Sequence, residues 1–263
     1  MKPKIKMTIF LFTFLFMLTP FAHAAGVLSE NIRIKSDVLG YDLQYRVYVP
    51  NNIKPEEKLP TLYITDGQSY AKKGRMVEAL NKGISNGKIK PVIAIFLDAR
   101  DPDNLKTNRR NEQFFCKKNY VDFFTTELLP VIDQTYATSN LREDRVILGV
   151  SFGGFNAGCF GLMATPYFGG VAMHSPAHSK FVKYLARQYK KFEKKNVKFY
   201  MSVGNEVDNR KAVRSLRRVL SDKGYDLTYS QTNHGHSWDN WVPKLPKVLR
   251  TFFAVDNVDV QSK

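Results

Sequence analysis

Residues 146–155 combine a buried strand with a sharp, glycine-rich turn, in the sequence Val146-Ile147-Leu148-Gly149-Val150-Ser151-Phe152-Gly153-Gly154-Phe155. The apolar run predicts a strand. The Gly-x-Ser-x-Gly pattern that closes it is typical of the turn that lifts a nucleophilic serine clear of the backbone. Gly149 and Gly153 carry no side chain where strand and following helix crowd together, so this strained turn is sterically possible. We therefore expect Ser151 to be the nucleophile of an enzyme.

Strand and helix patterns alternate on both sides of this turn. Before it, we predict two antiparallel strands within 31–49 that meet at Gly40, strands over 59–65 and 91–98, and helices over 71–81 and 121–132. After it, we predict helices over 153–163, 180–194, 211–221 and 241–253, and strands over 170–173, 197–203 and 226–231. This alternation predicts an α/β fold with a mostly parallel central sheet and helices on both faces. The polar segment 99–119 is long for a connection, and loops of that length are usually functional.

The N-terminus has the three parts of a secretory signal peptide. A basic start with three lysines precedes an apolar run over 9–18, and Ala22-His23-Ala24 is a small-x-small cleavage site. We expect residues 1–24 to be removed and the protein to be exported, either periplasmic or secreted. The apolar run is shorter than the ~20 residues of a spanning helix, so no stable membrane span is expected after cleavage. Residues 25–263 have the length of a single α/β domain.

The mature chain is strongly basic. Without the three N-terminal lysines, 37 lysines and arginines face 24 aspartates and glutamates. Such a field attracts anionic lipids, polysaccharides, nucleic acid or an acidic small substrate. The basic residues are spread out, with clusters within 190–195 and 210–218, as is typical of solvated helix faces. An exported protein has little reason to meet nucleic acid, so no such partner is expected. Cys116 and Cys159 can form one bridge in an oxidising compartment, and the sequence leaves their pairing open.

The base of the serine should lie near the C-terminus. In hydrolases of this architecture the triad follows the chain order serine, acid, histidine. Two histidines, His234 and His236, follow the last predicted strand. We expect His236 to be the base because it directly precedes the Ser237-Trp238 pair that leads into the final helix, and His234 is the alternative. A His-x-His pair also suits a metal, but no third ligand stands at a useful spacing, so no metal is expected.

The acid and the oxyanion donors are predicted from the loops that follow strands. The loop 204–210 carries Glu206 and Asp208. We favour Glu206 as the acid that orients the histidine, because it lies closer to the strand end, and keep Asp208 as the alternative. One oxyanion donor should be the backbone N–H of Phe152, immediately after the nucleophile. The second should come from Gly67 and Gln68, which follow an early buried strand.

Several segments together resemble the esterase D and enterochelin (siderophore) esterase branch of the α/β-hydrolases. They are Leu62-Tyr63-Ile64-Thr65-Asp66-Gly67-Gln68, Thr107-Asn108-Arg109-Arg110-Asn111-Glu112, Thr126-Glu127-Leu128-Leu129-Pro130-Val131-Ile132, Leu148 to Gly154, and Gly235-His236-Ser237-Trp238. The resemblance implies an α/β-hydrolase fold and hydrolysis of carboxylic esters through an acyl-enzyme, with no metal or organic cofactor. It implies Ser151 as nucleophile and His236 as base, with the Phe152 N–H and the Asp66-Gly67 loop as oxyanion hole.

Two departures from the family pattern bear on the expectations. Members often place the acid three residues after the glycine that ends its strand, and Val207 stands there, so the choice between Glu206 and Asp208 stays open. The family also includes acyltransferases that pass the acyl group to a sugar, and its motifs do not separate the two reactions. A binding module without turnover is the competing class, and the intact serine and histidine argue against it.

The function expected from the sequence is therefore an exported serine esterase that acts on a small-molecule ester. A siderophore ester is the candidate substrate, because a catecholate is anionic and the mature chain is basic. Simple acyl or feruloyl esters would use the same machinery and are the alternatives. Arg109 and Arg110 are candidate contacts to an acidic substrate, or else form ion pairs that order the long loop. The oligomeric state is left open.

Overall fold

The computed structural model describes residues 26–51, 53–54 and 56–255, so the predicted signal peptide lies outside the described residues. The strands are β1 (Gly26–Leu28), β2 (Ile32–Ser36), β3 (Tyr41–Pro50), β4 (Thr61–Ile64), β5 (Ile93–Asp98), β6 (Arg145–Val150), β7 (Gly170–His174), β8 (Lys198–Gly204) and β9 (Leu227–Thr232). The helices are α1 (Gly67–Lys72), α2 (Met76–Ser85), α3 (Arg110–Gln113), α4 (Lys118–Phe123), α5 (Leu129–Thr135), α6 (Phe152–Met163), α7 (Ser179–Lys191), α8 (Arg210–Asp222), α9 (Trp238–Trp241) and α10 (Leu245–Phe253).

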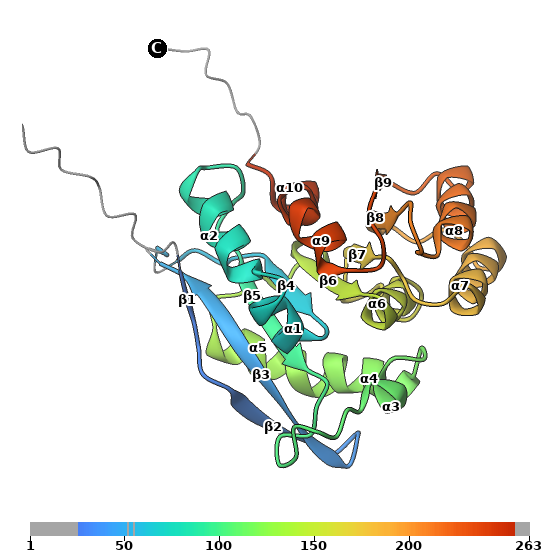
Figure 1. The fold of residues 1–263 in the computed structure, drawn as a ribbon. Helices are drawn as coiled ribbons and strands as arrows, with labels where there is room; N and C mark the ends of the chain where they lie inside the picture. The colour runs from blue at the N-terminus through green and yellow to red at the C-terminus, as the bar shows by residue number, and fades with distance from the viewer. Residues whose placement is uncertain (1–25, 52, 55, 256–263) are drawn as a thin grey trace, which may run out of the picture.

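All of the described strands belong to one sheet, in the order β1-β3-β5-β4-β6-β7-β8-β9, with β2 also paired to β3 (Figure 1). Strands β1, β2 and β3 pair antiparallel, and β4 to β9 pair parallel. The predicted antiparallel pair β2 and β3 is joined at Gly40, whose φ of 75° suits glycine. The predicted α/β class with a mostly parallel sheet is confirmed, while the short strand β1 was not predicted.

The strand order reverses direction at β4. From β4 the chain crosses to β5 on one side, and it later returns to form β6 on the other side of β4. The two strands run parallel, with Ile64 of β4 opposite Leu148 of β6. In open α/β sheets ligands bind at the carboxyl ends of the strands, where such a reversal leaves a crevice between diverging connections. The fold therefore brings the residues after Ile64 and after Val150 to the edge where a site is expected.

Helices cover both faces of the sheet. Helices α1, α2 and α10 pack on one face, and α4 to α8 pack on the other (Figure 1). Side chains of β6 alternate between the two layers, because successive strand residues point to opposite faces. Ile147 joins the core under α4 to α8, and Val146 and Leu148 join the core under α1, α2 and α10. Among the described residues no helix is long and apolar enough to cross a membrane.

Three predicted helices are interrupted, each at a residue that explains the break. The predicted helix 71–81 is replaced by α1 and α2, which are separated at Arg75, where φ is 50°. The predicted helix 121–132 contains a π-helical turn, Phe124–Leu128, between α4 and α5. Pro130 follows that turn, and its missing N–H and bulky ring disfavour a regular α-helix there. The predicted closing helix over 241–253 begins only at Leu245, because a 3₁₀ turn containing Pro243 precedes it.

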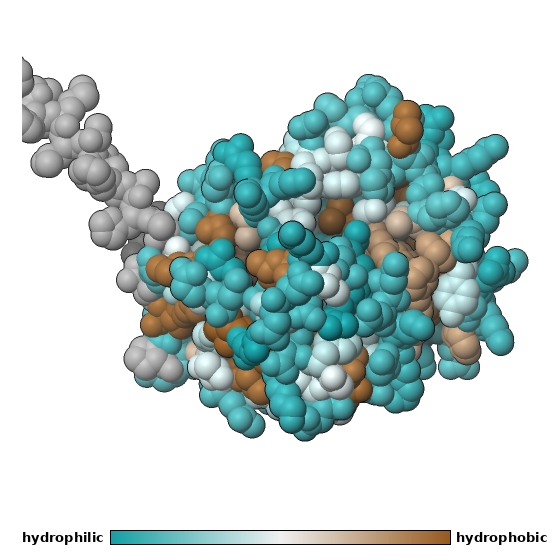
Figure 2. All heavy atoms as spheres, turned by 60° about the horizontal axis from the view of Figure 1, so that its bottom comes forward, coloured by the Kyte–Doolittle hydropathy of each residue, from teal (hydrophilic) through white to brown (hydrophobic). Residues whose placement is uncertain are grey.

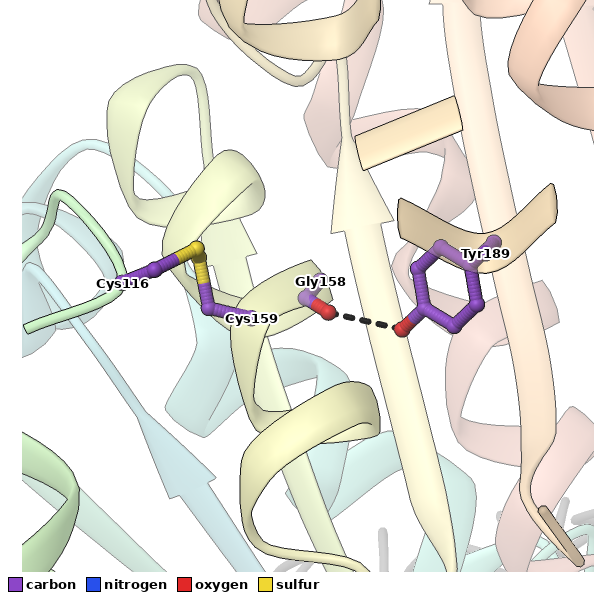
Figure 3. Close-up of a disulfide and its surroundings, with 4 residues drawn as sticks. All are labelled: Cys116, Gly158, Cys159 and Tyr189. Atoms are coloured by element: carbon purple, nitrogen blue, oxygen red, sulfur yellow. Dashed lines mark hydrogen bonds between the residues drawn. A yellow bond between two sulfur atoms is a disulfide. The ribbon is translucent and has the colours of Figure 1, made fainter. Parts of the chain in front are cut away.

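A disulfide bond joins Cys116 to Cys159, with 5.1 Å between their Cα atoms. Cys116 lies at the end of the long polar segment, and Cys159 lies in α6, the helix that follows Ser151 (Figure 3). One residue earlier in α6, the carbonyl of Gly158 accepts a hydrogen bond of 2.7 Å from the Tyr189 hydroxyl of α7. The helix behind Ser151 is thus attached to the polar segment on one side and to α7 on the other.

Candidate active site

Ser151 occupies the turn between β6 and α6, with φ of 54° and ψ of −119°. The turn is tight enough that a Cβ on Gly149 would lie 2.0 Å from the carbonyl oxygen of Gly153. A side chain at that position would therefore break the turn, as the motif predicts. The Ser151 N–H donates to the carbonyl of His174 over 2.8 Å, and its own carbonyl accepts from Ala177 over 2.8 Å. These bonds hold the serine in its strained conformation.

His236 makes the hydrogen bond to the serine that the sequence predicts. Its Nε2 lies 2.8 Å from Ser151 Oγ, and the ring stands edge-on to Trp241 with 5.0 Å between ring centroids. About a third of the side chain is exposed, so its ring reaches both the serine and the surface. His234, the alternative, has an exposed side chain, and its carbonyl oxygen packs against Gly204. The backbone of His234 therefore packs against the end of β8, while its side chain is exposed.

The carboxylate that contacts His236 is Asp208, and the preference for Glu206 is wrong. Asp208 Oδ1 lies 3.0 Å from His236 Nδ1, and its side chain is completely buried, whereas Glu206 is exposed. The chain turns at Val207, where φ is 38° and the residue is 98% exposed. This turn directs Glu206 to solvent and folds the following aspartate back under the strand end. Distance along the chain from the end of β8 is therefore a misleading guide to distance from the histidine.

Hydrogen bonds keep Asp208 ionised despite its burial. Its carboxylate accepts 2.8 Å bonds from the backbone N–H groups of Gly204 and Asn209, and a 2.6 Å bond from the Ser175 hydroxyl. Burial by itself raises the pKa of Asp208, but the bonds from His236, Ser175 and the two backbone groups outweigh it and hold the pKa below its usual value. A carboxylate of this kind can orient an imidazole and stabilise its protonated form.

Ser175, Asn240 and Trp241 form a supporting layer that sequence reasoning did not identify. The Ser175 hydroxyl, which donates to Asp208, accepts a bond of 2.8 Å from the indole N–H of Trp241. The Asn240 amide donates to the carbonyl of Gly235, beside the histidine, over 2.9 Å. One signal was present in the sequence. Ser175 lies two residues after the end of the predicted strand 170–173, so it could have been expected at the same sheet edge as Ser151.

The predicted oxyanion donors stand at two helix N-termini. Phe152 is the first residue of α6, and Gly67 and Gln68 are the first two residues of α1. The first N–H groups of a helix have no partner within it, so these three are oriented to bind an anion. Gly67 must be glycine, because a Cβ there would lie 2.3 Å from the carbonyl carbon of Phe96. Because β4 and β6 are neighbours, both helix starts lie at the same edge of the sheet.

Asp66 and Arg110 form an ion pair between those helix starts. Arg110 Nε lies 2.9 Å from Asp66 Oδ1, and a Cβ on Gly153 would lie 2.7 Å from Asp66 Oδ2. The guanidinium also lies over the ring of Phe152, 5.6 Å from its centroid. Burial raises the pKa of Asp66 to about 6, and the positive charge of Arg110 opposes that rise. The predicted substrate contact Arg110 therefore does lie beside the residue that follows the serine.

Arg109 is held within the long segment. It pairs with Asp101 at 2.5 Å and Glu112 at 3.2 Å, and it lies over the ring of Tyr41, 4.4 Å from the centroid. Both carboxylates belong to the segment 99–119 itself. The structure thus gives Arg109 the loop-ordering role that was its alternative, since its guanidinium is engaged by these partners and by the tyrosine.

Aromatic side chains gather next to the serine. The ring of Phe152 contacts Phe115, with 4.5 Å between centroids, and lies 5.9 Å from the ring of Phe181. Beside them is a groove of about 520 Å³, lined by Phe115, Phe155, Lys180, Phe181, Lys183, Tyr184 and Arg187. Figure 2 shows an apolar patch on this side of the molecule, surrounded by hydrophilic surface. We call the groove lined by these seven residues the aromatic groove. The groove therefore combines aromatic walls with three cations.

A serine, a histidine and a buried carboxylate joined in series at the carboxyl edge of a parallel sheet define the α/β-hydrolase class. The family described as "Putative esterase" matches residues 36–252, so the chain belongs to this esterase family. The protein is therefore an ester hydrolase. This membership agrees with the resemblance expected from the sequence.

Two solved structures share this fold, and one sequence relative covers most of the chain. A ferulic acid esterase structure is similar with a TM-score of 0.71 and 19% identity, over 87% of this chain and 98% of that chain. The enterobactin esterase FES of Shigella flexneri is similar with a TM-score of 0.75 and 20% identity, over 85% of this chain and 58% of that one. This chain thus spans little more than half of the latter enzyme. An uncharacterized Bacillus subtilis protein, YjcH, is 25% identical over 224 residues, 82% of this chain and 93% of its own.

Proposed function

We propose that the protein is an exported serine esterase whose catalytic triad is Ser151, His236 and Asp208. One observation carries the proposal, namely the continuous series of hydrogen bonds from Ser151 Oγ through the His236 ring to the buried Asp208 carboxylate. A serine hydroxyl becomes a good nucleophile when an oriented base takes its proton as it attacks. The distances support this assignment, because His236 and Asp208 are placed as such a base and its orienting group would be.

The reaction follows from the positions of these groups. His236 Nε2 takes the proton of Ser151 as Oγ bonds to the ester carbonyl, and Asp208 stabilises the imidazolium through Nδ1. The N–H groups of Phe152, Gly67 and Gln68 hold the oxyanion that develops. The imidazolium then gives its proton to the leaving alcohol, which leaves an acyl group on the serine. Water, deprotonated by the same histidine, releases the acid.

The aromatic groove supports an ester with an aromatic part as the substrate. Aromatic rings pair well with one another, and Lys180, Lys183 and Arg187 at the rim suit a phenolate, catecholate or carboxylate. A siderophore ester carries such catecholates, and a hydroxycinnamate ester carries a phenol. The two solved relatives are named for enterobactin and ferulic acid, one of each kind. We propose that the natural substrate is an aromatic ester, with siderophore esters as the leading case.

The serine mechanism is tested by covalent labelling. A fluorophosphonate probe should label the wild type and leave the Ser151→Ala variant unlabelled, because the probe reacts only with an activated serine. Equal labelling of both proteins would exclude Ser151 as the nucleophile. Folding of the variant is checked by circular dichroism. A binding module without turnover would be left unlabelled in both forms.

The substrate is tested with a panel of esters read by mass spectrometry. The panel contains catecholate siderophores, feruloyl esters and alkyl esters of matched length, each with and without sugar acceptors. We expect aromatic esters to have the higher kcat/KM, and we expect Phe181→Ala to lower kcat/KM for aromatic esters more than for alkyl esters. An equal loss for both kinds of ester would show that the groove does not select aromatic substrates. Acyl-sugar products in place of free acid would identify an acyltransferase.

Export is proposed from the N-terminal sequence and the disulfide. A structural disulfide such as Cys116–Cys159 persists in oxidising compartments and is rare in reducing ones. Mass spectrometry of protein recovered from the periplasm or medium of an expressing bacterium should find a chain that begins near Ala25. Recovery of only the uncleaved chain, inside the cell, would contradict export.

A further inference from the structure

The positive charge of the protein is concentrated in one stretch of sequence. Residues 180–223 contain 14 lysines and arginines but only four acidic residues, one of which is the buried Asp208. Within that stretch most of these cations belong to α7 or α8, which are separated in sequence by β8. In the fold, α7 and α8 lie side by side at one end of the molecule, so the cations of both helices reach the surface in the same region (Figure 1).

Helix α8 is divided cleanly into an apolar side and a basic side. Its buried residues Ala212, Val213, Leu216 and Leu220 pack into the core. The opposite side carries five exposed cations, Arg210, Lys211, Arg214, Arg217 and Arg218. At 100° per residue these five cover about a third of the helix circumference. Like charges at such spacing repel one another, so they do not stabilise the helix.

Helix α7 and the turn after it continue this surface. The helix exposes Lys180, Lys183, Arg187, Lys190 and Lys191. Two further exposed lysines follow at 194 and 195. We call the exposed cations of both helices, together with these two lysines, the basic face.

The basic face lacks the carboxylate partners that cations have elsewhere in the protein. Within the described residues, no lysine or arginine of α7 or α8 forms an ion pair with a carboxylate. The contacts they make are to neutral groups, such as Arg214 with the Gln231 side chain and Arg217 over the Tyr229 ring. Among the described residues, the one lysine or arginine of 180–223 in an ion pair is Lys198 of β8, whose partner Asp226 lies just beyond this stretch. The charge is therefore available to an external anion.

An exposed aromatic residue lies within the basic face. Phe192 directly follows α7 and is 50% exposed, between Lys191 and Glu193, with two further lysines after Glu193. A groove of about 430 Å³ adjoins it, lined by Cys116, Leu162, Met163, Tyr184, Gln188, Phe192, Glu193 and Lys195. Exposed apolar side chains surrounded by lysines are typical of surfaces that lie in a membrane interface, where the cations meet lipid phosphates and the ring enters the headgroup layer. A soluble polyanion would use the cations but not the ring.

We propose that the basic face docks this protein onto a membrane of anionic lipid. The lysines and arginines bind the phosphates of the headgroups, and Phe192 inserts between them. Because Lys180, Lys183 and Arg187 also form the rim of the aromatic groove, docking brings that groove close to the lipid surface. The binding is peripheral and reversible, and it does not depend on the serine chemistry proposed above.

Co-sedimentation with vesicles tests the proposal. The chain from Ala25 to Lys263 contains every described element and lacks the apolar N-terminal run, so it is the protein to use. It should sediment with vesicles of phosphatidylcholine containing phosphatidylglycerol and remain in solution with phosphatidylcholine alone. Added salt should release it, because screening weakens charge attraction. Sedimentation requires no turnover, so failure of the esterase mechanism leaves the result interpretable.

Matched variants locate the binding surface. The triple variant Lys211→Gln, Arg214→Gln, Arg218→Gln should bind anionic vesicles roughly 100-fold more weakly, since each basic side chain near an anionic surface contributes about a factor of five. The control Lys73→Gln, Lys82→Gln, Lys88→Gln removes the same charge from exposed positions near α1 and α2. Its binding should change by a few-fold at most. An equal loss in both triples would overturn the assignment to the basic face.

Phe192 distinguishes a membrane from a soluble polyanion. Phe192→Ser should weaken vesicle binding several-fold and leave binding to heparin unchanged, because only the membrane offers the ring an apolar phase. If vesicle binding does not change in this variant, or if neutral vesicles bind equally well, the docking proposal fails. Unfolding by urea shows whether the variant retains the wild-type fold.

Discussion

The charges around Ser151 and the charges on the basic face differ in what they contact. Near the serine, Asp208 accepts four hydrogen bonds of 3.0 Å or less, and Asp66 is buried against Arg110. On α8, Arg214 and Arg218 are exposed and without a carboxylate partner. A buried charge is stable only when every neighbour is placed to satisfy it, whereas an exposed charge is satisfied by water. The comparison predicts that substitutions near the serine disturb chemistry and fold, and that substitutions of the exposed cations on α8 disturb neither.

The largest effect is expected from the two acids of one loop. Asp208→Asn should lower kcat/KM about 10³- to 10⁴-fold, because an amide can neither fix the histidine tautomer nor stabilise the imidazolium. Glu206→Gln makes the same change of charge two residues away on an exposed side chain, and should alter kcat/KM by about twofold or less. Both are measured on an activated aryl ester at neutral pH. Equal losses would show that the loop as a whole, and no single carboxylate, supports the histidine.

The same loop marks the limit of sequence-based prediction in this protein. Ser151 and His236 were predictable because each belongs to a local motif, and the order of strands and helices fixed the sheet edge on which both lie. The contact of Asp208 with the histidine was not predictable, because it depends on the turn at Val207. That turn has a positive φ, which the residue types in the loop do not indicate. The carboxylate returns to the Gly204 N–H at the strand end, although it is four residues further along the chain.

The remaining features missed by the sequence depend on contacts between distant segments. Ser175 and Trp241 are 66 residues apart, and only the fold brings the hydroxyl of one to the indole of the other. The charge distribution is a similar case. Basic residues that are spread along the sequence face outward together, because α7 and α8 each bury an apolar side and pack against each other. The sequence pattern predicts that the basic residues of each helix face solvent. It does not predict that the two basic helix faces lie in the same region of the surface.

The next largest effect is expected from the disulfide, which attaches the segment carrying Arg110 to the helix behind Ser151. Replacing both cysteines by serine should lower the free energy of unfolding by about 2–4 kcal/mol, since the bond closes a loop between residues 43 positions apart. Urea unfolding of the double variant measures this loss. The wild type treated with a thiol reductant should lose a similar amount. If neither treatment changes stability, the segment is held by its other contacts alone.

A smaller, pH-dependent effect is expected at Asp66. Its pKa in the folded protein is raised to about 6 by burial, so between pH 4 and 6 the folded state holds a proton that the unfolded state releases. Stability from this group is therefore present at low pH and is lost as the pH rises through about 6. Asp66→Asn is tolerated at the φ of 56° and cannot titrate. Relative to the wild type, the variant should gain stability as the pH rises.

Urea unfolding at a series of pH values between about 4.5 and 8 checks this sign. The two proteins should have similar stabilities at the lowest pH, where Asp66 is protonated and resembles asparagine. As the pH rises to about 6, the free energy of unfolding of the variant should increase relative to that of the wild type by about 1–3 kcal/mol, at 1.36 kcal/mol for each pKa unit. Above pH 6 this difference should stay constant. A difference that moves in favour of the wild type would show that the ion pair with Arg110 outweighs burial.

The smallest effect on the free energy of unfolding is expected on the basic face. Removing cations there should not lower that free energy, whereas removing an arginine that is paired with a carboxylate should. The triple variant Lys211→Gln, Arg214→Gln, Arg218→Gln removes like-charge pairs at spacings of three and four residues on α8, each of which destabilises a helix by about 0.2–0.5 kcal/mol. Glutamine has nearly the helix propensity of arginine and lysine, so the free energy of unfolding should rise slightly or stay unchanged.

Arg145→Gln, which breaks the 2.7 Å pair of a buried arginine with Asp133, should instead cost roughly 1.5–3 kcal/mol. Urea unfolding at low salt compares the two. A loss of stability in the triple variant as large as that of Arg145→Gln would mean that these cations support the fold, and the contrast with the charges around Ser151 would disappear.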